Sequence, residues 1–218
     1  MKKIVLFFLC IYTALQMNAQ QTANDVGRFY AGFHSGYNNS SIKNQSIYNQ
    51  NNSGFLVGVD LSYALNKYFS LRAELNYEMK SAQGQITYYN SIGEQTLSYT
   101  KSQYLHYANI PVLAKIYLFN KDFKVFASTG LYDGYLIEAW VNPQDIGTSH
   151  DVTNDYLRND FGFIYGAGLQ YNIANNYTLT AEWRNTLGLT NISATASNYY
   201  NRTTIIQAGV AYKLFAKK

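Results

Sequence analysis

The sequence predicts a single all-β domain, a closed antiparallel eight-stranded β-barrel. Apolar and polar residues alternate with a period of two through eight segments, and short turns and long polar stretches join these segments alternately. Few residues are charged (14%) and many are aromatic (17%), which is unusual for a water-soluble domain. Side chains on a strand point alternately to opposite faces, so each segment has one apolar face. A chain of 218 residues suits one such barrel.

The first 19 residues have the composition of a signal peptide. Lys2 and Lys3 form a basic start, a short apolar run follows, and a polar stretch ends at Ala19. We expect cleavage before Gln20, which leaves residues 20–218 as an outer-membrane β-barrel domain. Cys10 lies inside the signal, and the bulky residues before it do not suit a lipidation site.

The mature chain has no cysteine, so disulfides and thiol catalysis are excluded. Removal of Lys2 and Lys3 leaves 15 basic and 13 acidic residues, a balance too weak to predict nucleic-acid binding. No segment after the signal approaches 18 consecutive apolar residues, so no membrane-spanning helix is predicted.

Alternation is clearest in residues 54–65 and 68–80, where one face of each segment is wholly apolar. A helix would instead place Arg72 and Glu74 among the leucines. Pro111 lacks a backbone donor, so a bulge or register change is expected near it. The eight predicted strands are residues 28–37, 54–65, 68–80, 104–119, 123–137, 161–173, 177–189 and 203–215.

The connections differ in length at the two ends of the predicted barrel. Three are tight turns and four are long polar stretches, of which the Asn-rich stretch 38–53 is expected to be a mobile loop. Short periplasmic turns and long extracellular loops are typical of outer-membrane barrels. The tight turns are 66–67, 120–122 and 174–176, and the long loops are 38–53, 81–103, 138–160 and 190–201.

The polar face of the predicted strands is expected to point into the barrel. It is rich in glycine, which a narrow interior requires, and its charges have mixed sign, so they can compensate one another in a lumen. We expect the apolar face to contact lipid. The predicted lumen charge network comprises Asp60, Arg72, Glu74, Glu78, Lys115, Glu182, Arg184 and Lys213.

Aromatic residues gather at the predicted strand ends, where rings with polar tips suit the lipid headgroup level. A soluble barrel with ordinary β-propensity for Tyr and Phe is the alternative. The girdle beside the short turns would comprise Tyr68, Phe69, Tyr117, Phe119, Phe123, Tyr171, Tyr177 and Tyr212. A second girdle, at the other end of the strands, would comprise Tyr77, Tyr104, Tyr135, Trp140 and Phe161.

The C-terminal residues Gln207, Gly209, Tyr212 and Leu214 resemble the signal by which assembly machinery recognises outer-membrane barrels. That pattern is a polar residue, a glycine two positions later, and then two hydrophobic residues spaced by one. A short tail after Phe215 departs from the barrels that end on the aromatic residue. The resemblance implies the barrel-assembly machinery as a partner.

Residues 109–115, 127–132 and 160–168 resemble segments of the small bacterial outer-membrane β-barrel domain family, which includes PorT-like and OmpX-like barrels. The likeness covers the whole mature chain and implies fold and location. The best-known PorT-like members assist a protein secretion system, so an accessory role in secretion or envelope integrity is implied. Fold alone does not define function.

The sequence gives little support for catalysis, and no cofactor is expected. His34 falls on the inner face, where a hydrogen-bonded lumen histidine is expected. In Ser149-His150-Asp151, adjacent residues cannot converge as a triad. His106, with Ser102, would suit a lipid-modifying enzyme only if both faced the bilayer. No metal-ligand spacing is present.

We therefore expect a non-enzymatic barrel in the outer-membrane lipid, with a structural or protein-interaction role through its long extracellular loops. A lipid-modifying enzyme and a narrow channel are the alternatives. Side chains just fill the interior of an eight-stranded barrel, which disfavours a wide pore.

Overall fold

The computed structural model describes residues 26–45, 47–48, 50–118, 123–143, 148–174, 176–195 and 198–216. The predicted signal peptide and its cleavage site lie outside these residues. The elements are β1 (Arg28–Lys43), β2 (Gln50–Ala64), β3 (Phe69–Tyr89), β4 (Gln95–Tyr117), β5 (Phe123–Pro143), β6 (His150–Asp151), the 3-10 helix η1 (Thr153–Asp155), β7 (Asn159–Ala174), β8 (Tyr177–Gly188) and β9 (Tyr200–Ala216).

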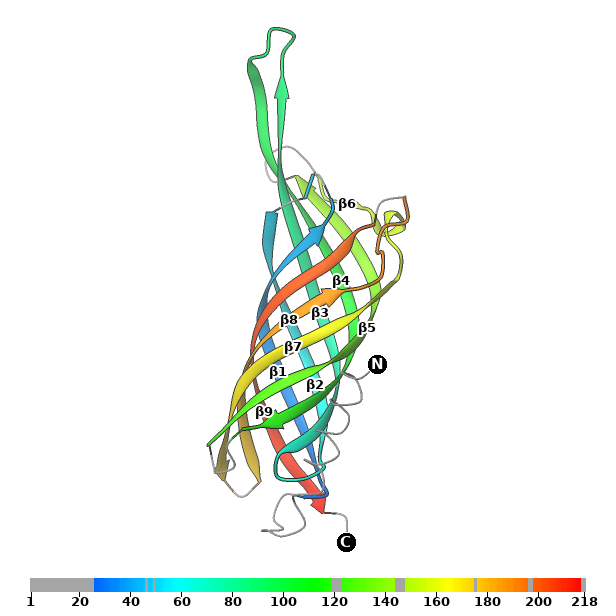
Figure 1. Ribbon diagram of the computed structural model, residues 1–218. Coiled ribbons are helices and arrows are strands. Elements are labelled where there is room, and N and C mark those ends of the chain that lie inside the picture. Colours follow the sequence, from blue (N-terminus) through cyan, green and yellow to red (C-terminus); the bar gives the residue numbers. More distant parts are fainter. Residues whose placement is uncertain are drawn as a thin grey trace, which may run out of the picture.

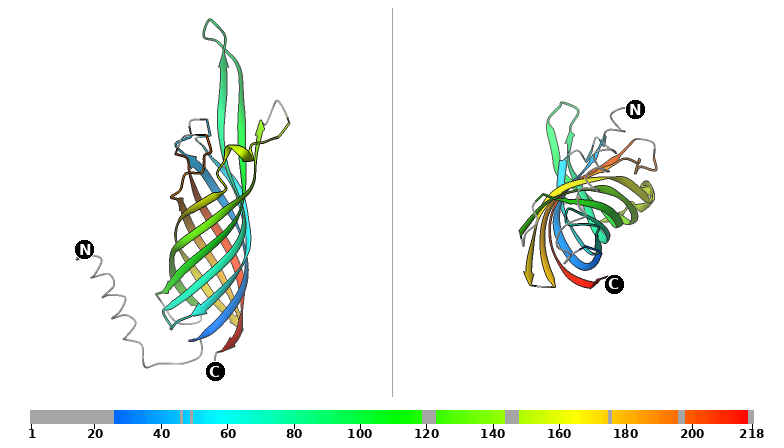
Figure 2. Two further views of the ribbon diagram at one scale, coloured as in Figure 1. Left: turned by 90° about the vertical axis from the view of Figure 1, so that its right-hand side faces the viewer. Right: turned by 60° about the horizontal axis from the view of Figure 1, so that its bottom comes forward.

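Eight of the strands form a closed antiparallel ring (Figures 1 and 2). Its order is β1-β2-β3-β4-β5-β7-β8-β9, and β9 pairs back onto β1 along almost the whole length of both strands. The two-residue β6 pairs only with the end of β5. Closure leaves the eight ring strands without a free edge across the barrel wall. The predicted eight-stranded barrel is confirmed.

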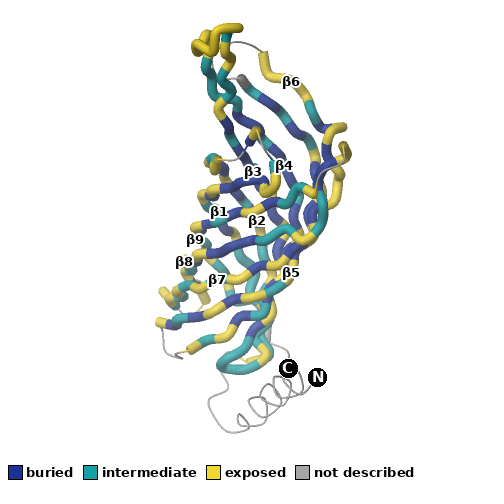
Figure 3. The backbone as a smooth tube through the Cα atoms, turned by 45° about the horizontal axis from the view of Figure 1, so that its top comes forward, coloured by how far each residue is buried: buried dark blue, intermediate teal, exposed yellow. Residues whose placement is uncertain are grey.

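The apolar face points outward and the polar face points inward, as predicted. Val59 and Leu75 are cross-strand neighbours with exposed fractions of 53% and 56%. Asp60 and Glu74, the next pair along these strands, point into the lumen, and Glu74 is only 3% exposed. The alternation of buried and exposed residues continues around the wall (Figure 3). No helix among the described residues is long and apolar enough to cross a membrane.

Glycines on the inner face allow side chains and backbone to approach closely. A Cβ atom at Gly58 would lie 1.9 Å from Asn76 Oδ1, and one at Gly130 would lie 2.0 Å from the Val112 carbonyl oxygen. Both positions therefore exclude a side chain, in agreement with the narrow lumen that the sequence predicts.

Two of the predicted long loops are largely strand. β3 continues to Tyr89 and β4 begins at Gln95, so residues 81–103 form a hairpin that projects beyond the rest of the barrel (Figure 1). The stretch 38–53 likewise contains the end of β1 and the start of β2. These segments were predicted wrongly because they lack a continuous apolar face, whereas strand pairing requires only backbone groups.

The expected irregularity at Pro111 is also absent. Between β3 and β4, the pairing is interrupted from the Ala73–Val112 pair to the Asn76–Asn109 pair. The register of the two strands is the same before and after this interruption. Pro111 pairs in register with Tyr132 on the β5 side. The register shift of β4 against β5 lies between His106 and Tyr107, so a missing donor at Pro111 interrupts the ladder without displacing it.

Aromatic residues of the predicted girdle gather at the short-turn end, although Phe119 lies outside the described residues. Phe123, Tyr171 and Tyr177 are each 50% exposed on the outer surface, and the rings of Tyr177 and Tyr212 lie 5.1 Å apart. Tyr117, predicted as part of this girdle, points inward, where its hydroxyl donates to Gln170 Oε1 at 3.0 Å. Tyr117 shares the inner face with Lys115 by strand alternation, so its placement in the girdle was wrong.

Candidate functional site

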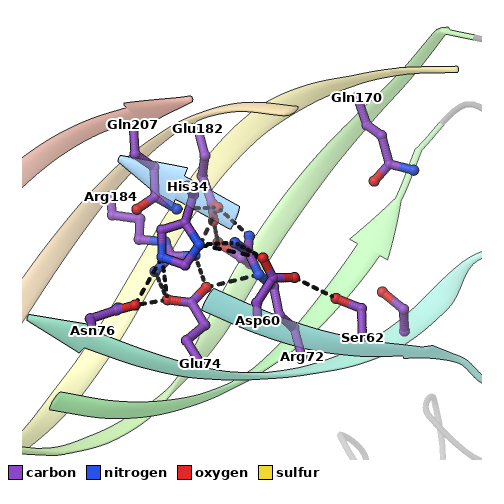
Figure 4. A network of polar contacts seen from close by, with 12 residues as sticks. His34, Asp60, Ser62, Arg72, Glu74, Asn76, Gln170, Glu182, Arg184 and Gln207 are labelled. Carbon is purple, nitrogen blue, oxygen red and sulfur yellow. Dashed lines mark hydrogen bonds and ion pairs between the residues drawn. The ribbon is translucent and has the colours of Figure 1, made fainter. Parts of the chain in front are cut away.

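Six ionisable side chains meet in the middle of the lumen and form what we call the central charge cluster (Figure 4). Four strands position them because inward-facing residues recur at every second position. β1 supplies His34, β2 supplies Asp60, β3 supplies Arg72 and Glu74, and β8 supplies Glu182 and Arg184.

The strongest contact of the cluster crosses the barrel. Arg184 Nη1 and Nη2 donate to Glu74 Oε2 and Oε1 at 2.8 and 2.6 Å. This is a bidentate pair between β8 and β3, which are four strands apart in either direction around the ring. Both side chains are almost completely buried. The pair therefore braces opposite walls of the barrel.

Arg72 joins three carboxylates. Its Nε lies 2.9 Å from Glu74 Oε1, Nη1 donates to Glu182 Oε2 at 3.2 Å, and Nη2 donates to Asp60 Oδ2 at 3.1 Å. Asp60 and Glu74 are cross-strand neighbours of like charge, and Arg72 neutralises the repulsion between them. Buried charges require such partners, because an unpaired one loses its hydration without compensation.

His34 is hydrogen-bonded within the cluster. Its Nε2 lies 2.9 Å from Asn76 Oδ1, while Asn76 Nδ2 donates to Glu74 Oε2 at 2.9 Å. Its Nδ1 lies 3.2 Å from Arg72 Nη2 and 3.3 Å from Asp60 Oδ2. The expectation of a hydrogen-bonded lumen histidine is met.

A second buried ion pair lies between the central charge cluster and the long-loop end. Lys80 Nζ lies 2.8 Å from Asp160 Oδ2 and 4.9 and 4.8 Å from the ring centroids of Tyr107 and Tyr132. Asn201 Nδ2 and the Tyr132 hydroxyl also donate to Asp160, at 2.8 and 3.1 Å. Asp160 belongs to β7, although the sequence predicts it at the end of the long loop 138–160. Its position two residues before Gly162 on the polar face is the signal that could have identified it.

An apolar cluster, which we call the outer plug, fills the barrel at its long-loop end. Strand residues such as Leu105 and Leu136 pack with loop residues such as Tyr48, Tyr156 and Ile192. Gln103 Nε2 donates to the Tyr156 hydroxyl within this plug. Three of the connections thus fold inward over the barrel end. The sequence alone does not predict this plug, because its members come from distant parts of the chain, from Ile42 to Ile192.

A cavity of about 380 Å³, which we call the vestibule, occupies the short-turn end of the lumen. All eight ring strands line it, and the central charge cluster, through His34, Asp60 and Arg72, closes its inner end. Lys115 and Lys124 lie on its wall, with their Nζ atoms 4.2 and 5.5 Å from the ring centroids of Phe126 and Tyr117.

The structure brings together five of the eight residues predicted for the lumen network: Asp60, Arg72, Glu74, Glu182 and Arg184. Glu78 is buried nearby and accepts hydrogen bonds from Asn38 and Asn109. Lys115 lines the vestibule. Lys213 pairs in register with Tyr30 on β1. It lies four residues along β9 from Gly209, the register partner of His34, which is about 13 Å at about 3.3 Å per residue.

The residues of the predicted assembly signal have contacts within the barrel. Gln207 Nε2 donates to Glu182 Oε2 at 3.1 Å. A Cβ at Gly209 would lie 2.9 Å from His34 Cβ. Tyr212 is exposed on the outer surface, and Leu214 is half-buried.

The other two histidines lie outside the lumen. His106 Nδ1 lies 2.5 Å from the Tyr77 hydroxyl and pairs in register with Glu138, whereas Ser102 is fully buried. His150 is exposed in β6. Among the described residues, neither contacts a serine or threonine hydroxyl, and no group of three or more His, Cys, Asp or Glu side chains is arranged to hold a metal ion.

The fold is similar to that of solved barrels. Neisserial surface protein A shares 17% identity with a TM-score of 0.52 over 85% of this chain and 97% of its own. OprG from Pseudomonas aeruginosa shares 12% identity with a TM-score of 0.47, over 89% of this chain and 99% of its own. Ail of Yersinia pestis shares 16% identity with a TM-score of 0.42, over 85% and 98%.

The chain matches no curated protein. Residues 18–194 match the outer membrane protein β-barrel domain. This match covers most of the chain, and it agrees with the closed ring and the lipid-facing apolar surface. The protein belongs to the outer membrane protein β-barrel domain family and is a bacterial outer-membrane protein.

Proposed function

We propose that this protein is a non-enzymatic outer-membrane barrel that captures an extended segment of another protein on its β3–β4 hairpin. The observation that carries the proposal is the pairing of residues 85–89 with residues 95–100. Among the described residues these segments pair only with each other, so both outer edges of the ribbon are free. A free edge presents unpaired backbone groups that an incoming strand can bind.

The hairpin is an ordered ribbon, which supports a docking role over that of a passive loop. Asn90 Oδ1 accepts from the backbone amides of Ile92 and Glu94 at 3.2 and 2.8 Å, and Gly93 takes a positive φ of 82° in the turn. The rings of Tyr88 and Tyr99 stack 6.2 Å apart. A preformed ribbon loses little entropy when it binds a partner.

The composition of the ribbon supports strand addition. Glu94 is the only charged residue in residues 84–100, whereas exposed edges are usually protected by lysine or proline. Tyr88, Tyr89 and Leu97 are 52%, 65% and 45% exposed. A ribbon with a single charge and exposed aromatic rings matches the chemistry of an extended segment with alternating apolar side chains.

The lumen geometry supports a role outside the barrel interior. The outer plug, the Lys80–Asp160 pair and the central charge cluster occupy successive levels of the lumen, which disfavours a channel. Among the described residues, neither His106 nor His150 contacts a serine or threonine hydroxyl, which disfavours a lipid-modifying enzyme. Accessory roles in secretion or envelope integrity are compatible with a protein-binding hairpin.

Shortening the hairpin tests the proposal. Gly84 and Lys101 pair in register, so an Asn-Gly turn can join them and delete residues 85–100 while the ring keeps its pairing. A photo-crosslinker at Tyr88 should capture a partner through an extended peptide, identified by mass spectrometry, and one at the lipid-facing Tyr135 should not. The shortened protein should lose that partner in co-purification from native membranes.

The matched control for the shortened hairpin is Ile92→Asn, which changes the exposed turn but leaves both edges intact. It should retain the partner. Equal recovery of the partner with the correctly folded shortened protein would refute the proposal.

We also infer that the chain is processed before Gln20 and assembled through its C-terminal strand. The match to the family begins at residue 18, next to the predicted cleavage site, which supports processing there. N-terminal sequencing of the protein from outer-membrane fractions tests the cleavage site. The exposed Tyr212 is compatible with recognition by the assembly machinery, and Tyr212→Ala should slow assembly in cells more than Tyr171→Ala, a change at an equally lipid-facing position.

A further inference from the structure

We propose that the vestibule binds a small phosphate- or carboxylate-bearing anion that enters from the periplasmic side, with Lys115 as its main cationic contact. The cavity reaches the β2–β3 turn through Asn66 and Lys67, and short turns face the periplasm in outer-membrane barrels. Its volume of about 380 Å³ is within the range of small-molecule sites.

The charge of the vestibule wall favours an anion. Lys67, Lys115 and Lys124 all line the cavity, and Asp60 is the one acid among its described lining residues. Asp60 is held by Arg72 Nη2 at 3.1 Å, which keeps its carboxylate within the central charge cluster. The residues that line the vestibule therefore carry more positive than negative charge.

Lys115 is the lining residue whose charge an anionic ligand would stabilise most. It is only 4% exposed, and its ammonium group lies over the Phe126 ring at 4.2 Å. Within the described part of the chain, no carboxylate lies within ion-pair distance of its Nζ, although the charges of Glu182 and Asp60 act on it from farther away. A buried cation without a direct ion-pair partner is costly, and a bound anion would supply one.

Neutral donors on the same wall complete the site. The Tyr117 hydroxyl donates to Gln170 Oε1 at 3.0 Å, and Gln170, which lines the cavity, also carries an amide nitrogen donor. The Tyr117 hydroxyl also lies 3.3 Å from the Ser70 hydroxyl. Lysine acts as a point charge for phosphate, and amide and hydroxyl groups can then bond its remaining oxygens.

Calorimetric titration of the folded protein with inorganic pyrophosphate and with citrate tests this site. In nonionic detergent at low salt we expect saturable binding of one anion per protein. Lys115→Gln should weaken it by about tenfold or more, because a charge-assisted contact is lost. Lys43→Gln, at the exposed far end of β1, is the matched control and should leave binding unchanged.

Ser70→Glu keeps the proposal testable if Lys115→Gln fails to fold. It places a negative charge on the vestibule wall and should also abolish binding. Absence of saturable binding to the wild-type protein, or equal binding by the wild-type protein and a folded Ser70→Glu variant, would overturn the proposal.

A second arm of the titration distinguishes the source of the anion. The same measurement is made in phosphatidylcholine vesicles with and without phosphatidylglycerol. Competition by phosphatidylglycerol would identify a lipid headgroup as the natural ligand. Undiminished binding of the soluble probe would identify a free periplasmic anion.

Discussion

Arg72 on β3 and Glu182 on β8 meet across the lumen at 3.2 Å, although the two strands are four positions apart around the ring. Together with the Glu74–Arg184 pair, this contact joins opposite walls of the barrel. The barrel interior is thus organised by residues 110 positions apart in the sequence. Each strand contributes one acid and one base, and each arginine contacts the acid of its own strand as well as the acid of the other, so the four side chains form one network.

Removing Glu182 should destabilise the protein strongly. Its carboxylate accepts hydrogen bonds from Arg72, Arg184, Ser128 and Gln207, so Glu182→Ala leaves two buried guanidinium groups with fewer partners. We expect a loss of about 3–5 kcal/mol in the free energy of unfolding. Thr180→Ala on the same strand is the control and should cost far less. Unfolding by guanidinium chloride in lipid vesicles measures the stability of both variants. Similar losses of stability would show that the contacts of Glu182 across the lumen contribute little.

Charge should be tolerated differently on the two faces. Val59→Arg places a cation against lipid and should cost about 2–4 kcal/mol if the site lies near the bilayer midplane. Ser70→Arg should be milder, because Ser70 borders the vestibule. Asn76→Arg, which the sequence alone groups with Ser70, should instead be severe, since Asn76 is enclosed between His34 and Glu74. Denaturant titrations in lipid vesicles measure the stability of the three variants. Equal losses of stability would contradict the assignment of the lipid-facing and lumen-facing sides.

Two lysines that contact tyrosine rings should respond very differently to substitution. Lys80 is 1% exposed and paired with Asp160, so Lys80→Met leaves a buried carboxylate and should cost about 3–5 kcal/mol. Lys101 Nζ lies 5.9 Å from the Tyr48 ring near the barrel rim, and Lys101→Met should change stability by less than about 1 kcal/mol. Equal destabilisation in denaturant titrations would show that the Lys80–Asp160 pair contributes little.

The inner face should not accept a side chain at Gly130. A Cβ there would lie 2.0 Å from the Val112 carbonyl oxygen, so Gly130→Val should prevent folding or separate β4 from β5. Gly93→Asn in the hairpin turn is the control, because nothing lies within 4 Å of its Cβ position and Asn tolerates its positive φ. Protease resistance of the refolded proteins gives the comparison. A Gly130→Val protein as resistant as the wild type would contradict the close approach.

The purified protein should not conduct ions at the level of a general porin. Three levels of packed side chains lie along the lumen, and the vestibule ends at the central charge cluster. Recordings in planar bilayers, with a general porin as the positive control, test this. Stable porin-sized steps from correctly folded protein would restore a channel role.

The sequence by itself determined the barrel, its strand number and the direction of each face. Val59 and Asp60 show why: side chains on a strand alternate between lipid and lumen, so adjacent residues carry opposite chemistry. Strand segments without a continuous apolar face, such as those within residues 81–103, were not predicted, because strand pairing requires only backbone groups.

Only the tertiary structure decided which lumen residues meet. The ion pairs of Arg72 with Glu182 and of Lys80 with Asp160 depend on the stagger of the strands around the closed ring, which alternation along one strand does not specify. The same stagger brings Tyr48, Tyr156 and Ile192 together over the barrel end. It also places Lys115 in the vestibule wall, whereas Arg72 and Arg184 contact the carboxylates of the central charge cluster directly.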